Sequence, residues 1–196
     1  MNSLQADQEK LPVENSMDLL ILLLYAPGKS GNCGENVEGI TRLQKLMFLL
    51  QQGLGPEHLV EEAELYSYEP YKMGPYAPDL KKDIVELQSV GIIMTERLEY
   101  WIQDDADDAD ADEDDDLDVS RRPGKLVQSA AYSLSQTRGT DVGCRLWESL
   151  PSKRQREMIK FKSFFNSLSL RQLLIFTYRR FPGYAKRSTI KSNLGL

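Results

Sequence analysis

One segment of this 196-residue chain constrains its fold more than any other, because it cannot join a hydrophobic core. Residues 104–118 contain 11 acidic residues and no basic residue. A run of this kind repels itself and buries no apolar surface, so in isolation we expect it to be disordered. It lies between two strand-like segments, residues 92–102 and 126–135. The sequence therefore predicts a β-hairpin with an acidic insertion at its tip.

The remaining charges are also segregated along the chain. Residues 1–103 carry 8 basic and 16 acidic residues, whereas residues 121–196 carry 16 basic and 3 acidic residues. A basic block of this size can attract phosphate groups or an acidic protein. Three interpretations of the acidic run stay open. It is a solvated loop, a loose binder of divalent cations, or a segment that lies against a basic surface, its own or a partner's, and competes there with nucleic-acid phosphates.

Length and apolar content narrow the class of protein. The chain is long enough for one domain, or for one domain with a helical extension. Its longest apolar run, Leu19–Ala26, falls far short of the roughly 20 residues that span a bilayer. The first residues lack the pattern of a signal peptide, so a cytoplasmic location is expected. Cys33 and Cys144 have no CxxC spacing, and we expect two free thiols.

Apolar spacing and capping residues predict most of the regular structure. A short strand in residues 64–77 is expected to turn at Gly74-Pro75. The predicted helices begin at Asn15 or Ser16, at Glu38 or Thr41, at Pro78, at about Thr140, at Pro151 and at Ser169. Two helices, a short strand, a third helix and a hairpin are close to the order of a winged helix.

The predicted fold is thus mainly α with a small β-hairpin, a winged-helix-like domain followed by C-terminal helices. We expect residues 1–14 to form a flexible tail and residues 15–136 to form the winged-helix-like domain, with the acidic insertion at 103–120. Residues 137–196 then form a basic helical C-terminal region.

The sequence offers no catalytic, cofactor or metal site. Gly28-Lys29-Ser30 matches the last three residues of the phosphate-binding loop motif. The first glycine of that motif is replaced by Leu23, which lies inside a predicted helix. His58, the single histidine, is typical of an exposed loop residue. No serine or cysteine has the glycine elbow of an activated nucleophile. We therefore expect a protein that is not an enzyme and needs no cofactor or metal.

An aromatic segment around residues 66–76 contains four tyrosines, Tyr66, Tyr68, Tyr71 and Tyr76. Tyrosine rings combine a large apolar face with a hydroxyl group, which suits either a core edge or a binding surface. A structural role for the Gly74-Pro75 turn and its neighbours is one interpretation. If the segment instead forms contacts, Tyr71, Lys72 and Tyr76 are the expected partner-binding residues.

Two motifs in the N-terminal half resemble a known group of proteins. They are RLQKLMFLL at residues 42–50 and YKMGPYAPDL at residues 71–80, followed by a helix that ends in LQSVGII. The pattern is similar to the YwgA-like proteins and, more distantly, to the Panacea domain of SocA-like antitoxins. It covers roughly residues 17–102, and the C-terminal LLIFTYRRFPGYAKRS is also similar to the end of such proteins. The resemblance implies a winged-helix-related fold, a non-enzymatic role and a genomic place beside toxins or phage-defence genes, although the acidic insertion departs from the family pattern.

These observations lead to two main functional hypotheses. The first is an antitoxin-like or phage-defence-associated regulator that acts through protein contacts. Its expected partner-binding residues are Tyr71, Lys72, Tyr76, Arg154, Lys160, Arg179 and Arg180. The second is a winged-helix transcriptional regulator that binds nucleic acid. Its expected contacts are Arg42, Lys45, Lys81 and Lys82. A structural subunit of a larger defence complex is a third possibility, and no membrane contact is expected.

Overall fold

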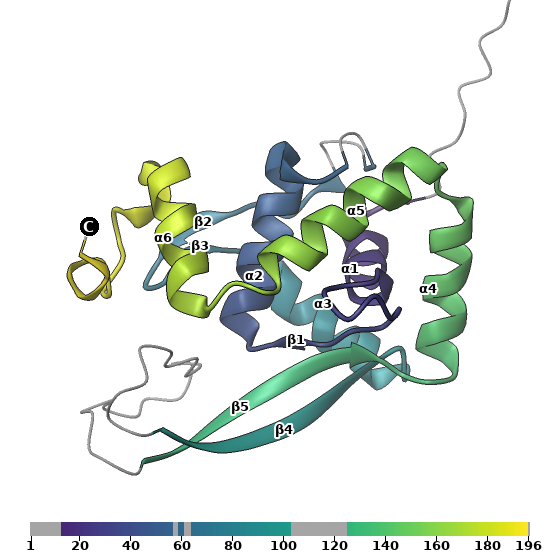
Figure 1. Ribbon diagram of the computed structural model, residues 1–196, viewed down its shortest axis with the longest axis horizontal. Coiled ribbons are helices and arrows are strands. Elements are labelled where there is room, and N and C mark those ends of the chain that lie inside the picture. The colour runs from purple at the N-terminus through teal and green to yellow at the C-terminus, as the bar shows by residue number, and fades with distance from the viewer. Residues whose placement is uncertain (1–12, 57–58, 61–63, 103–124, 196) are drawn as a thin grey trace, which may run out of the picture.

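The computed structural model describes residues 13–56, 59–60, 64–102 and 125–195 (Figure 1). This part of the chain is mainly α-helical with two small antiparallel sheets, which confirms the predicted fold class at that level. None of the described helices is long and apolar enough to cross a membrane. The α-helices are α1 (Ser16–Tyr25), α2 (Ile40–Leu49), α3 (Pro78–Ser89), α4 (Arg138–Ser149), α5 (Ser152–Phe165) and α6 (Leu170–Arg180).

Helix α1 is buried on almost all sides. Asn15 caps it as predicted, because its side chain accepts a hydrogen bond of 2.9 Å from the backbone N–H of Asp18. Leu20, Leu22 and Leu23 have no exposed surface at all. The helix contacts α4 and β5, so its leucines lie at the centre of the molecule. Val13, expected within the flexible tail, is also buried in this core.

Helix α2 is the second buried helix and ends earlier than predicted. Its Phe48 ring packs against Tyr68, Phe181 and Tyr184, with ring centroids 4.7 to 5.1 Å apart. The apolar spacing in the sequence, with Gly53 and Gly55 as stop signals, predicts that this helix continues to Gln52. Instead, the chain passes at Leu50 into a π-helical turn, η1 (Leu50–Leu54), that contains Gly53 with φ of 76°.

A short hairpin lies between α2 and α6 (Figure 1). Its strands are β2 (Glu69–Tyr71) and β3 (Gly74–Tyr76), so the turn falls at residues 72–73 and not at Gly74-Pro75 as predicted. Gly74 begins the return strand with φ of 93°, and a Cβ atom there would lie 2.7 Å from the Tyr178 ring. Glycine is needed both for the backbone angle and for the close approach of α6.

The predicted long hairpin is confirmed. β4 (Ile93–Ile102) pairs antiparallel with β5 (Lys125–Leu134) along their full length, and the ribbon runs along one side of the helices (Figure 1). The acidic insertion at 103–120 lies outside the described residues. The sequence did not predict β1 (Val37–Glu38), which pairs with β5 and gives the strand order β1-β5-β4. Two residues are too few for the alternation that identifies a strand.

The C-terminal helices begin close to the predicted residues. Pro151 separates α4 from α5, and Ser169 caps α6 in a capping box with Gln172. Short 3-10 turns, η3 (Pro182–Ala185) and η4 (Ser192–Leu194), follow. The main hydrophobic cluster contains side chains from α1, α2, α3, α5 and α6, so residues on both sides of position 136 share one core.

Candidate partner-binding surface

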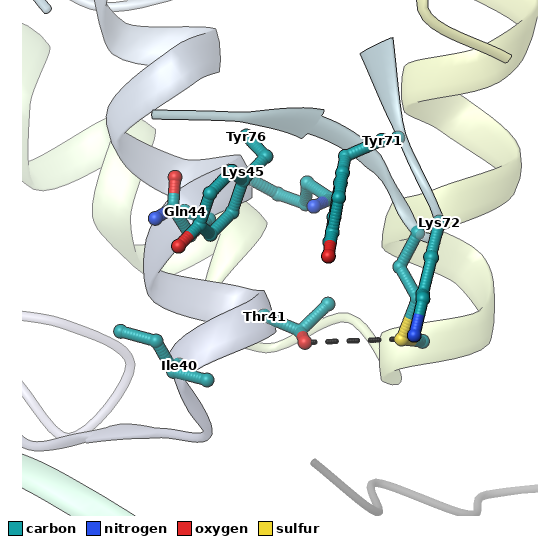
Figure 2. A pocket seen from close by; sticks show the side chains of 9 residues that line it. Ile40, Thr41, Gln44, Lys45, Tyr71, Lys72 and Tyr76 are labelled. Atoms are coloured by element: carbon teal, nitrogen blue, oxygen red, sulfur yellow. Dashed lines mark hydrogen bonds between the residues drawn. The ribbon is translucent and has the colours of Figure 1, made fainter. Parts of the chain in front are cut away.

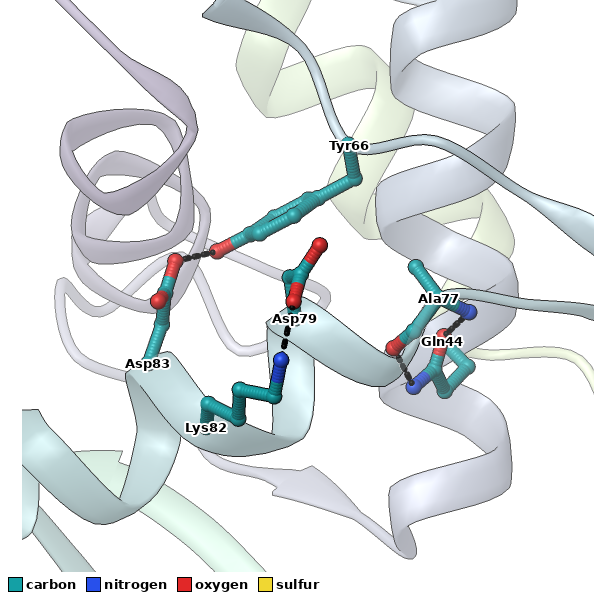
Figure 3. A network of polar contacts seen from close by, with 6 residues as sticks. All are labelled: Gln44, Tyr66, Ala77, Asp79, Lys82 and Asp83. Atoms are coloured by element: carbon teal, nitrogen blue, oxygen red, sulfur yellow. Dashed lines mark hydrogen bonds and ion pairs between the residues drawn. The ribbon is translucent and has the colours of Figure 1, made fainter.

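The two motifs that carry the family resemblance are joined by buried hydrogen bonds. The Gln44 side chain on α2 donates to the backbone oxygen of Ala77 at 2.9 Å and accepts from its N–H at 3.0 Å (Figure 3). Lys45 donates from Nζ to the backbone oxygen of Pro75 at 3.0 Å. All of these atoms are buried, so the pairing fixes β3 and the start of α3 against α2.

A second polar contact in this region holds α3 from the other side. The Tyr66 hydroxyl donates to Asp83 Oδ2 at 2.7 Å (Figure 3). Burial and the hydrogen bond to Asp83 raise the pKa of Tyr66, so its hydroxyl stays protonated as the donor. The segment before the hairpin and α3 are thereby linked.

The hairpin and the first half of α2 enclose a small recess, which we call the α2–hairpin recess (Figure 2). Its cavity volume is about 40 Å³, enough for a few water-sized groups or the tip of a side chain but too small for a cofactor. The recess is lined by Ile40, Thr41, Gln44, Lys45, Tyr71, Lys72, Met73, Gly74 and Tyr76.

Two aromatic rings dominate the open side of this recess. The Tyr71 and Tyr76 rings lie 4.9 Å apart between centroids at an angle of 30°, and Tyr71 is 38% exposed. The Thr41 hydroxyl donates to Met73 Sδ at 3.9 Å, and this contact joins α2 to the hairpin turn (Figure 2). The structure thus brings together three of the predicted partner-binding residues, Tyr71, Lys72 and Tyr76. The sequence did not point to Ile40, Thr41 or Met73, because nothing in their spacing relates α2 to the hairpin turn.

The other four predicted partner-binding residues do not line the recess. Arg154 and Lys160 lie on α5, where Arg154 Nη1 is 3.4 Å from Glu157 Oε2. Arg179 and Arg180 end α6 and are exposed, with the Arg180 guanidinium 5.5 Å from the centroid of the Phe181 ring. The predicted set is therefore distributed over three places on the molecule.

The chain after α6 returns to the hairpin and adds basic residues beside the recess. The backbone N–H of Thr189 donates to the Lys72 oxygen at 2.9 Å, and the Tyr178 hydroxyl donates to Ser188 Oγ at 2.9 Å. The exposed side chains of Lys186, Arg187 and Lys191 belong to this returning segment. No acidic residue follows Glu157 in the sequence.

Two of the four predicted nucleic-acid contacts are buried, so that prediction is wrong for them. Arg42 is 6% exposed and donates from Nη1 to the backbone oxygens of Asn166, at 3.4 Å, and of Leu168. Lys45 is 2% exposed. Both cations donate to backbone oxygens, Arg42 to two of them and Lys45 to that of Pro75, and neither side chain is exposed as a phosphate contact requires. Lys81 and Lys82 are exposed on α3.

Lys82 is not an isolated positive charge. Its Nζ lies 2.7 Å from Asp79 Oδ1, and this hydrogen bond with the accompanying charge raises the pKa of Lys82. The pair is exposed and drawn in Figure 3. Any phosphate bound by Lys82 would have to compete with Asp79.

The loop that contains Gly28-Lys29-Ser30 binds an anion from its own chain. The backbone N–H groups of Lys29 and Ser30 donate to the Glu35 carboxylate at 3.2 and 2.8 Å, and Asn166 Nδ2 donates to it at 3.2 Å. Burial alone would raise the pKa of Glu35, but hydrogen bonds from Ser30, Asn166 and Lys29 lower it. The amides of this loop are therefore already paired with a carboxylate.

Lys162 on α5, which the sequence places among the C-terminal bases, has no exposed surface. Its Nζ donates to the backbone oxygens of Leu24, Ala26 and Glu35 at 2.9, 2.7 and 2.7 Å. These oxygens belong to the end of α1 and the loop after it. Burial lowers the pKa of Lys162 to about 7, although the charge of Glu35 opposes this shift.

This lowered pKa predicts a stability that depends on pH. The unfolded chain keeps the Lys162 proton up to the ordinary pKa of 10.5, whereas the folded protein releases it near pH 7. Between these values the unfolded state binds more protons, so the free energy of unfolding should rise with pH. Urea denaturation across this interval should show a steeper rise for the wild type than for Lys162→Met. Equal slopes in the two proteins would contradict the assignment.

The rest of the described chain adds no evidence of a cofactor or metal site. It contains no group of three or more His, Cys, Asp or Glu side chains that could hold a metal ion. His58 lies outside the described residues. The predicted absence of a catalytic group stays a prediction.

Comparison of the chain with protein-family models found no matching family, and comparison with curated proteins and with solved structures found no matching protein. The resemblance to the YwgA-like proteins thus depends on the motifs alone. What the structure adds is a physical link between those motifs, through Gln44 and Lys45.

Proposed function

We propose that this chain is a non-enzymatic binding protein that contacts another protein through the α2–hairpin recess, as an antitoxin-like or phage-defence-associated regulator would. The observation that carries the proposal is the pair of tyrosine rings at the open side of the recess, with Lys72 beside them. Tyrosine is enriched among the residues that dominate binding energy at protein interfaces, because a partly exposed ring loses much apolar surface on binding.

A winged-helix-like scaffold is part of this proposal. Apart from η1 and the β2–β3 hairpin, which lie between α2 and α3, the chain order α1-β1-α2-α3-β4-β5 and the sheet order β1-β5-β4 support it, because α2 and α3 then occupy the places of the two helices of a helix-turn-helix, flanked by the β4–β5 ribbon. In a helix-turn-helix that reads DNA, the second helix enters the major groove. Here that helix is α3, and the α2–hairpin recess is built on the connection between the two helices.

The charges on α3 and the ribbon favour a protein partner over nucleic acid. Among the exposed residues described there, three are basic and four are acidic. The basic ones are Lys81, Lys82 and Arg97, and the acidic ones are Asp79, Glu86, Glu96 and Glu99. Binding to DNA depends on a surplus of basic groups that replace counterions on the phosphates. This face offers no such surplus.

The second candidate function is the nucleic-acid-binding regulator, and the observation in its favour is the exposure of Lys81 and Lys82 together with the basic segment after α6. If it is correct, duplex DNA should bind at about 50 mM salt and dissociate steeply as salt rises. The same assay on a variant without residues 104–118 would show whether the acidic run competes with DNA.

The decisive experiment uses the products of the neighbouring genes as candidate partners. Each is co-expressed with this chain, tested for rescue of growth where it is toxic, and measured for affinity by calorimetry. Tyr71→Ala and Tyr76→Ala should each weaken a complex by about tenfold or more, since interface tyrosines often contribute above 1 kcal/mol. Val85→Ala, at a 59% exposed apolar position on α3, is the matched control and should bind like the wild type.

Two outcomes would overturn the proposal. One is that no neighbouring product forms a complex or is neutralised. The other is a complex whose affinity is unchanged by both tyrosine substitutions, because the partner would then bind elsewhere on the surface. Binding of duplex DNA with steep salt dependence, without any protein complex, would favour the second candidate.

A further inference from the structure

The segment that follows α6 shares a hydrophobic cluster with the β2–β3 hairpin. This second cluster consists of Leu170, Leu174, Tyr178, Ala185 and Leu194, with Met73 and Ile190 among the residues packed against it. Met73 also lines the α2–hairpin recess, so one side chain belongs to both the recess and the cluster. Apolar contacts therefore hold the segment after α6 beside the recess, in addition to the hydrogen bond from Thr189 to the Lys72 oxygen.

The exposed charges of the hairpin and of this segment are mostly basic. Within residues 69–76 and 179–195, six exposed residues are basic and one is acidic. The basic ones are Lys72, Arg179, Arg180, Lys186, Arg187 and Lys191, and the acidic one is Glu69. Positive charges that gather on one surface attract a negatively charged ligand and raise its local concentration. This surface thus differs from α3 and the β4–β5 ribbon, where exposed acidic residues outnumber basic ones.

The recess itself is suited to an apolar group. Three polar side chains that line it, those of Thr41, Gln44 and Lys45, already make hydrogen bonds within the chain. At its open side the Tyr71 and Tyr76 rings offer apolar faces. The cavity of about 40 Å³ accepts the tip of one side chain. An apolar tip would cover ring surface without placing an unpaired polar group in the recess.

We propose that the partner of the α2–hairpin recess is an acidic segment of another protein, in which one apolar side chain is flanked by aspartate or glutamate residues. The apolar side chain enters the recess against the two tyrosine rings, and the flanking carboxylates lie over Lys72, Lys186 and Arg187. The complementary charges of the two surfaces select such a segment over a neutral or basic one. This inference rests on the proposed function, because it names the chemistry of the partner that the same recess binds.

The basic residues and the tyrosine rings should act on different steps of binding. Charges at the edge of an interface mainly change the rate of association and its dependence on salt, whereas buried contacts mainly change the rate of dissociation. Reversal of the charges of Lys186 and Arg187 should therefore slow association. Removal of the Tyr71 ring should instead speed up dissociation. Exposed bases that serve only solubility would change neither rate.

The probe for the test is a pair of labelled synthetic peptides, each with a central leucine between three flanking residues on either side. The flanking residues are all aspartate in one peptide and all asparagine in the other. Anisotropy titrations of the full chain at about 50 mM salt should show at least about tenfold tighter binding of the aspartate peptide, and this preference should shrink as salt screens the charges. Because residues 104–118 contain 11 acidic residues, the titration is repeated on a variant without them to exclude competition.

Two charge-reversal variants separate a local effect from one of net charge. The double variant Lys186→Glu with Arg187→Glu should lose the preference for the aspartate peptide, and its association in stopped-flow measurements should be slower by about tenfold. The matched control combines Arg145→Glu on α4 with Arg156→Glu on α5, two exposed residues on helices that contribute nothing to the recess. It changes the net charge by the same amount and should keep the preference. Urea denaturation checks that both variants are folded.

Several results would overturn the inference. Equal affinity for the two peptides, in the full chain and in the shortened variant alike, would show that the surface does not select acidic segments. An equal effect of both charge-reversal variants would mean that net charge alone attracts the peptide. A DNA oligonucleotide that binds through Lys186 and Arg187 as tightly as the peptide, with no effect of Tyr71→Ala, would identify a general phosphate-binding surface.

Failure of this inference can be told apart from failure of the proposed function. A complex with a neighbouring gene product that is weakened by Tyr71→Ala, but not by reversal of Lys186 and Arg187, would refute the acidic partner and leave the recess as the binding site.

Discussion

Replacing Lys162 with methionine should lower the free energy of unfolding by about 3 kcal/mol. We expect no larger loss from the substitution of any other buried charged residue described in the structure. Methionine fills a similar volume but has no donor. The variant would leave three backbone oxygens without their shared donor, those of Leu24, Ala26 and Glu35. The bonds to Leu24 and Ala26 are buried, so water cannot replace the lost donor there. Part of this cost is offset, because the variant no longer has to remove a charged amine from water when it folds.

Lys160→Met is the matched control for this experiment. Lys160 lies two residues away on the same helix and is exposed, so its replacement should change the free energy of unfolding by no more than about 0.5 kcal/mol. Urea denaturation of the three proteins at one pH gives the comparison. The difference in the free energy of unfolding between the wild type and Lys162→Met should grow at higher pH. The folded wild type then holds Lys162 as a neutral amine, so it is no longer destabilised by a buried charge. Two variants of equal stability would refute the role assigned to Lys162.

Replacing Gln44 with leucine should cost about 2 to 4 kcal/mol and loosen the hairpin that forms the recess. Both hydrogen bonds of the Gln44 amide go to the backbone of Ala77 and are buried. Leucine would leave a buried N–H group and a buried oxygen unpaired. Because β3 and the start of α3 depend on this contact, the recess should lose its shape although no exposed residue changes.

The measurement combines stability with partner binding. Gln128→Leu is the control, since Gln128 is exposed on β5 and its side-chain amide donates to the exposed Glu99, at 3.0 Å. We expect Gln44→Leu to lower both the urea midpoint and the affinity for the partner of the recess, and Gln128→Leu to leave both nearly unchanged. Unaltered stability in Gln44→Leu would mean that Ala77 finds another partner.

Much of the helical structure could be predicted from the sequence, because its signals are local. Asn15, Pro78 and Ser169 mark helix starts through hydrogen bonds or backbone angles that involve only their near neighbours. The pairing of β4 with β5 was also predictable from strand-like composition on both sides of the acidic run. The two-residue strand β1 was not, because its formation depends on β5, nearly a hundred residues away.

The candidate site could be predicted only in part, for the same physical reason. Tyr71, Lys72 and Tyr76 are close in sequence, and a turn brings them together. The burial of Lys162 could not be foreseen, because its acceptors Leu24 and Ala26 precede it by more than 130 residues. A charged residue with helical spacing reads as solvent-exposed unless the distant oxygens that bind it are known.

The order of the larger sheet leaves β4 as an edge strand, a position from which β-proteins can aggregate. Within the described residues, β4 pairs only with β5, so one side of a ten-residue strand presents unpaired backbone groups. Strands of this length can template the addition of further strands from other molecules. Glu96, Arg97 and Glu99 are exposed along β4. Charged side chains on an edge strand oppose its pairing with a strand of another molecule, so we expect these residues to protect the ribbon against edge-to-edge aggregation.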